Sequence, residues 1–162
     1  MITAIIKDVQ KKYLEAVDYY EKALSDKYSS ASVVYYINLS FIYWSFAAQH
    51  FEFNIPNDIP DEWSVIGENN YELVINKGID KYPNSLELHF WKRYYSFALY
   101  GEDFTKDDCI SLINTFDNTT LVPYFFLYLF DKVKYQKECN RLIEECIKLP
   151  TAKNTHIYSF LK

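Results

Sequence analysis

The sequence predicts an all-α fold built from about seven to eight helices. Glycine is scarce, with 3 residues in 162, whereas β-sandwiches and barrels need many tight turns. Apolar residues recur at three- and four-residue steps along most of the chain, which is the period of an amphipathic helix. Aromatic residues make up 19% of the chain, and most of them follow this period. We therefore expect a core of large flat side chains with tyrosine hydroxyls at its edge.

Seven segments carry the helical pattern, and residues 151–161 could form a short terminal helix. Six of the segments are expected at 3–26, 31–50, 61–81, 84–100, 105–116 and 135–148. Another is expected to begin at residue 119 or 120, with Pro123 in its first turn. Residues 28–30 are expected to end the first helix. An irregular linker near 52–61, rich in Asn, Asp and Pro, is expected between the second and third helices. A chain of this length can bury enough surface for one core, so we expect a single domain over residues 1–162.

The end of the first predicted helix holds aromatic and small side chains in a fixed order. They are Tyr13, Ala16, Tyr20 and Ala23-Leu24. This order and spacing resemble the second helix of the tetratricopeptide repeat, a helix–turn–helix unit of 34 residues. Residues 71–83 and 135–150 resemble it more loosely.

The resemblance implies helices stacked as antiparallel hairpins in an α-solenoid, with a concave face lined by the first helix of each pair. On that face we expect Phe41 and Trp44 of the second helix. We also expect His89, Arg93 and Tyr100, which follow one side of the fourth helix. An irregular helical bundle is the alternative, because it would show similar apolar spacing.

Charge is distributed unevenly along the chain, whose net charge is −5. Residues 28–76 contain no Lys or Arg. The same stretch contains six acidic residues, which are Glu52, Asp58, Asp61, Glu62, Glu68 and Glu72. Such a surface would attract a basic protein and repel phosphates, so we expect a basic protein partner, such as a nuclease toxin, and no nucleic acid. Charge runs are also found on ordinary solvated helix faces.

Residue patterns typical of helical enzymes and metal sites are not found in the sequence. The histidines, His50, His89 and His156, are far apart, and no His-Glu-x-x-His motif or phosphate loop is present. The three cysteines form no CxxC pair and are expected to be buried free thiols in a reducing cytosol. We therefore expect no catalytic residues, no metal and no cofactor.

The chain is expected to be cytoplasmic and to have no membrane partner. Residues 29–51 lack charged side chains and are long enough to span a bilayer. They nevertheless contain several Ser residues together with Asn38, Gln49 and His50. The first ten residues lack the basic and apolar regions of a secretory signal.

The sequence thus predicts a non-enzymatic protein-binding module. Its most specific form is a small cytoplasmic inhibitor, or immunity protein, that neutralises a basic toxin through an acidic surface. A peptide-binding adaptor or chaperone that uses a concave groove is the alternative, and an enzyme whose site is assembled only in three dimensions is a third. The candidate binding residues are Phe41, Trp44, Glu52, Asp58, Asp61, Glu62, His89, Arg93 and Tyr100.

Overall fold

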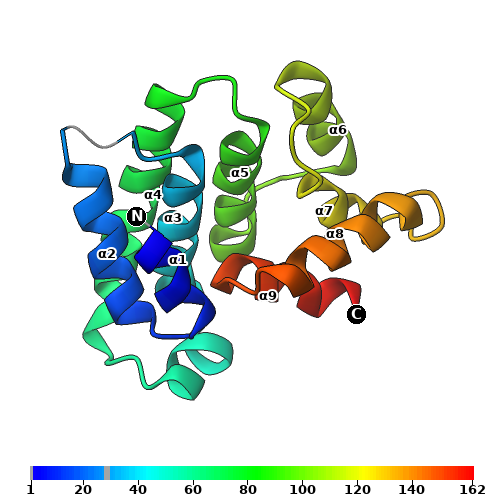
Figure 1. The fold of residues 1–162 in the computed structure, drawn as a ribbon. Helices are drawn as coiled ribbons and strands as arrows, with labels where there is room; N and C mark the ends of the chain where they lie inside the picture. Colours follow the sequence, from blue (N-terminus) through cyan, green and yellow to red (C-terminus); the bar gives the residue numbers. More distant parts are fainter. Residues whose placement is uncertain (1, 28–29) are drawn as a thin grey trace. The chain divides into compact units, whose positions relative to one another are not determined.

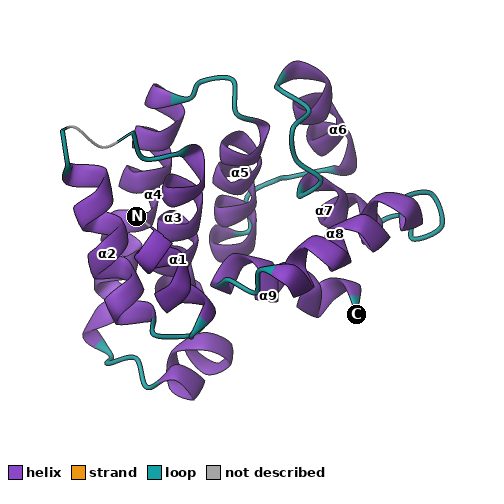
Figure 2. Cartoon of the chain, in the orientation of Figure 1, coloured by secondary structure: helices purple, strands orange, loops and turns teal. Residues whose placement is uncertain are grey.

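The computed structural model describes residues 2–27 and 30–162, and over these residues it is all-α. Figure 2 shows helices and loops and no strand in this part of the chain. The predicted all-α class is confirmed, and the described residues form nine α-helices, one π-helical turn and one 3₁₀ turn, more than the seven to eight helices expected. A solenoid is not identified. The predicted helix end at 28–30 falls mostly outside the described residues.

The chain divides into two compact units, Met1–Tyr82 (unit 1) and Pro83–Lys162 (unit 2). Unit 1 contains α1 (Ile2–Val9), α2 (Tyr13–Ser25), α3 (Val33–Ala48), a π-helical turn η1 (His50–Asn54), a 3₁₀ turn η2 (Ile55–Asn57) and α4 (Glu62–Lys81). Unit 2 contains α5 (Leu86–Tyr100), α6 (Lys106–Thr115), α7 (Pro123–Tyr128), α8 (Gln136–Lys148) and α9 (Ala152–Leu161). Figure 1 shows these helices along the chain.

The single helix predicted at 3–26 is wrong, because the structure has two helices there, α1 and α2, which pack against each other. The chain reverses between them at Lys11, whose φ of 61° lies in the left-handed region. Neither glycine nor proline marks this reversal. The apolar period runs through it without a break, which is why the sequence suggests one helix.

A buried carboxylate holds this hairpin on α3. Asp8 is fully buried, although an acid four residues before a lysine, here Lys12, is typical of an exposed ion pair on a helix. Its Oδ2 accepts a hydrogen bond of 3.0 Å from the Tyr20 hydroxyl, and Asn38 Nδ2 donates to that same hydroxyl oxygen over 3.0 Å. Because a buried charge is costly unless it is hydrogen-bonded, these contacts favour one arrangement of α1, α2 and α3.

Helices α3 and α4 approach each other closely at Gly67. A Cβ atom at this position would overlap the Tyr43 carbonyl oxygen and lie 2.9 Å from the Phe46 Cβ. Only glycine therefore fits this contact without a shift of the backbone. The glycine does not interrupt the helix, because α4 continues from Glu62 to Lys81.

The irregular linker expected near 52–61 is instead an ordered pair of helical turns. The Phe53 ring packs on Tyr13, with ring centroids 4.5 Å apart, and on Phe46 at 5.9 Å. Buried Asn54 donates from Nδ2 to the Phe46 carbonyl oxygen over 2.8 Å. Asp58 closes the 3₁₀ turn in the left-handed conformation, which short polar residues tolerate. The connection between α3 and α4 is therefore fixed to the core of unit 1.

Unit 2 follows the predicted helices more closely. The Ser85 side chain caps α5 and Gly101, at φ 68°, ends it. Thr105 and Asp108 form a capping box at the start of α6, and Thr151 caps α9. The core is aromatic: its largest buried side chains are Phe90, Trp91, Tyr95, Phe125 and Phe126.

Replacing Gly67 by Ala should destabilise unit 1 by about 2–3 kcal/mol, because the added methyl group forces α3 and α4 apart. Hydrogen exchange of the α3 amides measures the loss. The matched control is Glu72→Ala, which truncates an exposed side chain of the same helix and should change stability by less than about 0.5 kcal/mol. Equal protection of α3 in both variants would contradict the close approach.

Candidate functional site

The strongest candidate surface lies on residues 51–73 of unit 1, called here the acidic segment. It comprises η1, η2 and the first part of α4. All six of its carboxylate side chains are exposed, including the predicted binding residues Glu52, Asp58, Asp61 and Glu62. Four of the nine candidate residues are thus accessible and lie within one short ordered stretch.

Four carboxylates of the acidic segment lie outside any ion pair. Among the described residues, Glu52, Asp58, Asp61 and Glu62 take part in no ion pair. Elsewhere in unit 1, by contrast, Lys22 is paired with Asp18 over 2.7 Å. No ion pair of the described residues therefore offsets the negative charge of these four carboxylates.

Exposed apolar side chains lie among these acidic residues, and their exposure was not predicted from the sequence. Phe51 is 75% exposed, and Ile55, Val65 and Leu73 are each more than half exposed. Val65 and Leu73 are eight residues apart on α4, so they lie on the same side of that helix. In the sequence, these two positions fall outside the helical period of the buried residues of α4, and this offset was the signal that they face solvent. An apolar and acidic surface of this kind can contact a protein through both burial and charge.

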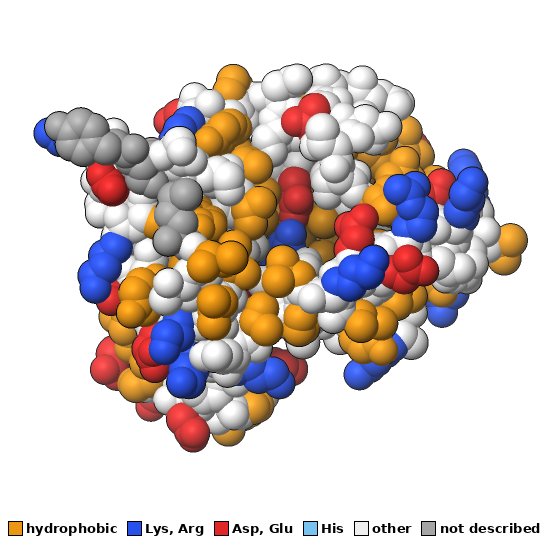
Figure 3. Space-filling view, viewed as in Figure 1, with side chains coloured by type: hydrophobic (Ala, Val, Ile, Leu, Met, Phe, Trp, Pro, Cys, Tyr) orange, Lys and Arg blue, Asp and Glu red, His pale blue; other side chains and the backbone are white. Residues whose placement is uncertain are grey.

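The net charge of the protein resides in unit 1. Unit 1 contains 7 lysines and 12 acidic residues, and unit 2 contains 10 basic and 10 acidic residues. In Figure 3, acidic side chains lie along the lower edge, where Figure 1 shows the connection between α3 and α4. The six acidic residues of the segment, with no Lys or Arg among them, carry more negative charge than the net charge of −5 of the whole protein.

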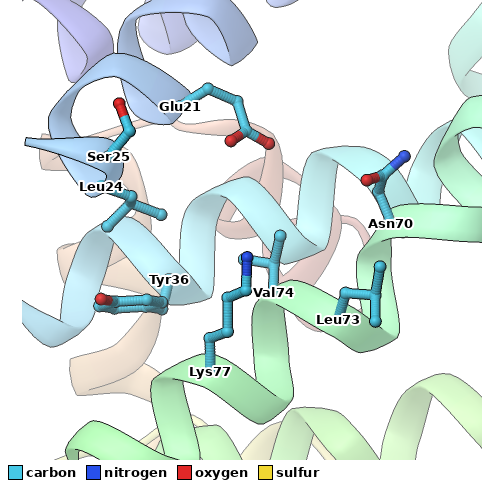
Figure 4. A pocket seen from close by; sticks show the side chains of 8 residues that line it. All are labelled: Glu21, Leu24, Ser25, Tyr36, Asn70, Leu73, Val74 and Lys77. Carbon is cyan, nitrogen blue, oxygen red and sulfur yellow. The ribbon is translucent and has the colours of Figure 1, made fainter.

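A small groove between α2 and α4 is the second candidate in unit 1. Its volume is about 170 Å³. It is lined by Glu21, Leu24, Ser25, Tyr36, Asn70, Leu73, Val74 and Lys77, as Figure 4 shows. Glu21 is already engaged, because its Oε1 accepts a hydrogen bond of 2.7 Å from the Tyr43 hydroxyl. The groove could take one apolar side chain of a peptide between Leu24 and Leu73.

Phe41 and Trp44 do not line an accessible face, contrary to the prediction. Phe41 is 0% and Trp44 2% exposed, and their ring centroids lie 5.4 Å apart. Helix α3 is buried on nearly every side from Tyr35 to Phe46. The middle of this helix therefore belongs to the packed interior, and neither residue can touch a partner in this structure.

The candidate residues on α5 of unit 2 are engaged in contacts within that unit. The His89 ring stacks on Phe116 at 3.8 Å, and its Nε2 lies 2.8 Å from the Pro83 carbonyl oxygen, to which it can donate. Arg93 pairs with Asp108 over 3.4 Å and lies above the Phe104 ring.

Tyr100 is 57% exposed at the end of α5. On the side of α5 predicted to bind, His89 and Arg93 thus make contacts within unit 2, and Tyr100 is the most exposed of the three residues. Whether any of these three residues contacts a partner stays a prediction.

The three cysteine thiols are buried. Cys109, Cys139 and Cys146 are buried and free, as expected, and burial raises the pKa of the Cys109 thiol to about 12. Thiolates are therefore disfavoured. Within the described part of the chain, no group of three or more His, Cys, Asp or Glu side chains is arranged to hold a metal ion. None of the described helices is both long and apolar enough to cross a membrane.

His156 predicts a pH dependence of stability. Burial lowers its pKa to about 4, and its Nε2 lies 2.9 Å from the Tyr94 hydroxyl. An unfolded histidine titrates near 6.5, so between these values the unfolded chain binds the extra proton. Unit 2 should therefore lose about 2 kcal/mol of stability from this residue as the pH falls from about 7 to about 4.5.

The measurement is urea unfolding at both pH values, monitored through unit 2 amides. His156→Gln, which cannot take up the proton, should lose correspondingly less stability over the same range. An identical loss in the wild-type and variant chains would show that His156 is not held neutral by burial.

Among the candidates, the acidic segment combines four exposed carboxylates outside any described ion pair with exposed apolar side chains, all within one ordered stretch of unit 1. The groove adds a smaller recess on α2 and α4. No protein-family model matches the chain, and no curated protein or solved structure is significantly similar to it.

Proposed function

We propose that this protein is a non-enzymatic binding module that captures a basic protein through its acidic segment. The observation that supports this proposal most directly is a set of four exposed carboxylates without ion-pair partners, on Glu52, Asp58, Asp61 and Glu62, beside exposed Phe51 and Ile55. In its most specific form, the protein is a cytoplasmic inhibitor of the immunity type, which neutralises a basic toxin. Helical hairpins that stack like tetratricopeptide repeats would form its scaffold, and the α1–α2 hairpin with buried Tyr13 and Tyr20 supports that part.

The carboxylates and the apolar side chains of the segment would contribute to binding in different ways. Exposed ion pairs contribute only about 0–1 kcal/mol each, so the carboxylates mainly speed the encounter and select a partner of opposite charge. Complete burial of an apolar side chain contributes about 1.5–3 kcal/mol. Phe51, Ile55, Val65 and Leu73 would therefore supply most of the affinity, each in proportion to the area that is exposed now.

The fixed conformation of the segment supports a binding role. Phe53 and Asn54 hold η1 against Tyr13 and the end of α3. Because little conformational entropy is lost when a rigid surface binds, more of the contact energy appears as affinity. A solvated connection without function would not need such anchoring, and it would not expose Phe51.

A nuclease toxin suits this surface as a partner. Enzymes that bind nucleic acid present Lys and Arg side chains to the phosphates. An inhibitor with a net charge of −5, concentrated in one unit, would compete for the same basic face. The same charge disfavours direct binding of nucleic acid.

A second candidate function, peptide binding, is favoured by the groove between α2 and α4. Leu73 lines this groove and is also exposed on the acidic segment. A peptide that inserts an apolar side chain there would depend on Leu73 and Tyr36 rather than on Asp61 and Glu62. This difference separates the two proposals.

The partner can be sought by capture with the tagged chain from extracts of the native host, together with the product of the neighbouring gene. With that partner, Asp61→Lys combined with Glu62→Lys should slow association by about 10-fold or more at low salt, and the difference should shrink as salt is added. The measurement is stopped-flow or surface-based association kinetics. Glu144→Lys combined with Glu145→Lys is the matched control, because it makes the same charge change on exposed residues of unit 2.

Equal slowing by both double variants would show that only net charge matters and would contradict a specific role of the segment. Unchanged binding in the Asp61 and Glu62 variant, with loss of binding in Leu73→Asp, would show that the groove is the binding site and that the carboxylates are not. Failure to bind any protein more tightly than about 1 µM, or about −8 kcal/mol, would contradict both.

A further inference from the structure

The connection between α7 and α8 in unit 2 exposes apolar and basic side chains together. Leu129 and Phe130 are about half exposed, and Val133 is 90% exposed. Lys132 and Lys134 flank Val133, are both exposed, and form no ion pair among the described residues. We call these five residues the basic tip. At the right edge of Figure 3, where Figure 1 shows this connection, hydrophobic and basic side chains lie together.

The basic tip is held in place rather than loose. The Phe130 ring packs edge-on against buried Phe126, with centroids 5.3 Å apart. The Asp131 Oδ1 accepts a hydrogen bond of 3.0 Å from the backbone N–H of Lys134. The ammonium of Lys132 lies 5.9 Å from the Tyr128 ring centroid. The apolar side chains therefore remain exposed because the turn is fixed in a conformation that presents them.

The basic tip is opposite in charge to the acidic segment, and both surfaces also carry exposed apolar side chains. One surface offers lysines around Val133 and Phe130, and the other offers carboxylates around Phe51, Ile55 and Val65. We propose that the basic tip of one copy docks on the acidic segment of a second copy, so that the protein self-associates head to tail. Opposite charges on the two surfaces would orient the encounter, and the apolar side chains of each would be removed from water.

A second copy fits the tip better than an anionic lipid surface or an unrelated acidic protein does. The complementary surface belongs to the same chain and is present at the same concentration. A bilayer with anionic headgroups would also attract the lysines but would repel unit 1, which carries the net charge of −5. Because the contact joins two different surfaces, a dimer still has a free segment on one copy and a free tip on the other, and short chains of copies can form.

This inference shares the acidic segment with the proposed function but does not depend on the toxin partner. Self-association would cover the segment, so a basic partner would have to displace the neighbouring copy. The contact is small and its rim is charged, and we expect a dissociation constant on the order of 100 µM at low salt.

Sedimentation velocity of the full chain at increasing concentration tests the proposal. The wild-type protein should show a rising weight-average sedimentation coefficient up to about 500 µM at low salt, and the rise should disappear at about 0.5 M salt. Lys132→Glu combined with Lys134→Glu should remain monomeric throughout. Asp61→Ala combined with Glu62→Ala should weaken association by at least about 10-fold. Circular dichroism of each variant verifies that it is folded.

Mixing the two double variants gives the decisive result. The Asp61 and Glu62 variant retains a native tip, and the lysine variant retains a native acidic segment. The mixture should therefore form heterodimers, and it should not form longer chains because no further native pair of surfaces is left. A concentration-independent monomer in the wild type, association that survives in the lysine variant, or a mixture that stays monomeric would each overturn the proposal.

The same variants distinguish this inference from the proposed function. The lysine variant should still capture the basic partner, whereas the Asp61 and Glu62 variant should be impaired in both assays. Wild-type self-association without any captured partner would leave the inference standing and remove the proposed function.

Discussion

The backbone contact between α3 and α4 at Gly67 is the constraint on which the candidate surface depends. It allows Tyr43 and Phe46 of α3 to meet the α4 backbone directly. The inner side of α4 is then buried through Tyr71, Val74 and Ile75. One side of α4 is thus committed to the core, and Val65, Glu72 and Leu73 are left on the other side.

The connection that precedes α4 is fixed by the same packing. Phe53, Asn54 and Trp63 contact Phe46 on α3, so the turns that carry Glu52 and Asp58 have little freedom to move. A surface of this type loses little entropy when it binds. Its apolar residues can provide affinity while its carboxylates provide selectivity, because exposed charges contribute little energy individually but act on encounter at longer range.

Much of the fold could be predicted from local signals. The caps at Ser85 and Thr105 and the terminating Gly101 place the helices of unit 2 correctly, because their hydrogen bonds join residues a few positions apart. The reversal at Lys11 could not be predicted, since it depends on Asp8 meeting Tyr20 and Asn38 from two other helices. The order of the connection near 52–61 likewise comes from distant contacts with Tyr13 and Phe46.

The candidate site was predictable only in part, for a similar reason. The absence of Lys and Arg from residues 28–76 indicated an acidic surface, and the exposed carboxylates are consistent with it. Helical period alone could not tell which side of α3 would face solvent. In the structure residues 35–46 of this helix are all buried, Phe41 and Trp44 among them.

The account rests on the claim that residues 51–73 form the surface that a basic protein contacts. Amide chemical shifts of the isotopically labelled chain, followed by NMR during titration with the captured partner, test this claim most directly. The account predicts that the largest changes fall on η1, η2 and the exposed side of α4. Changes confined to α5 or to the helices that follow it, with the amides of residues 51–73 unaffected, would contradict it.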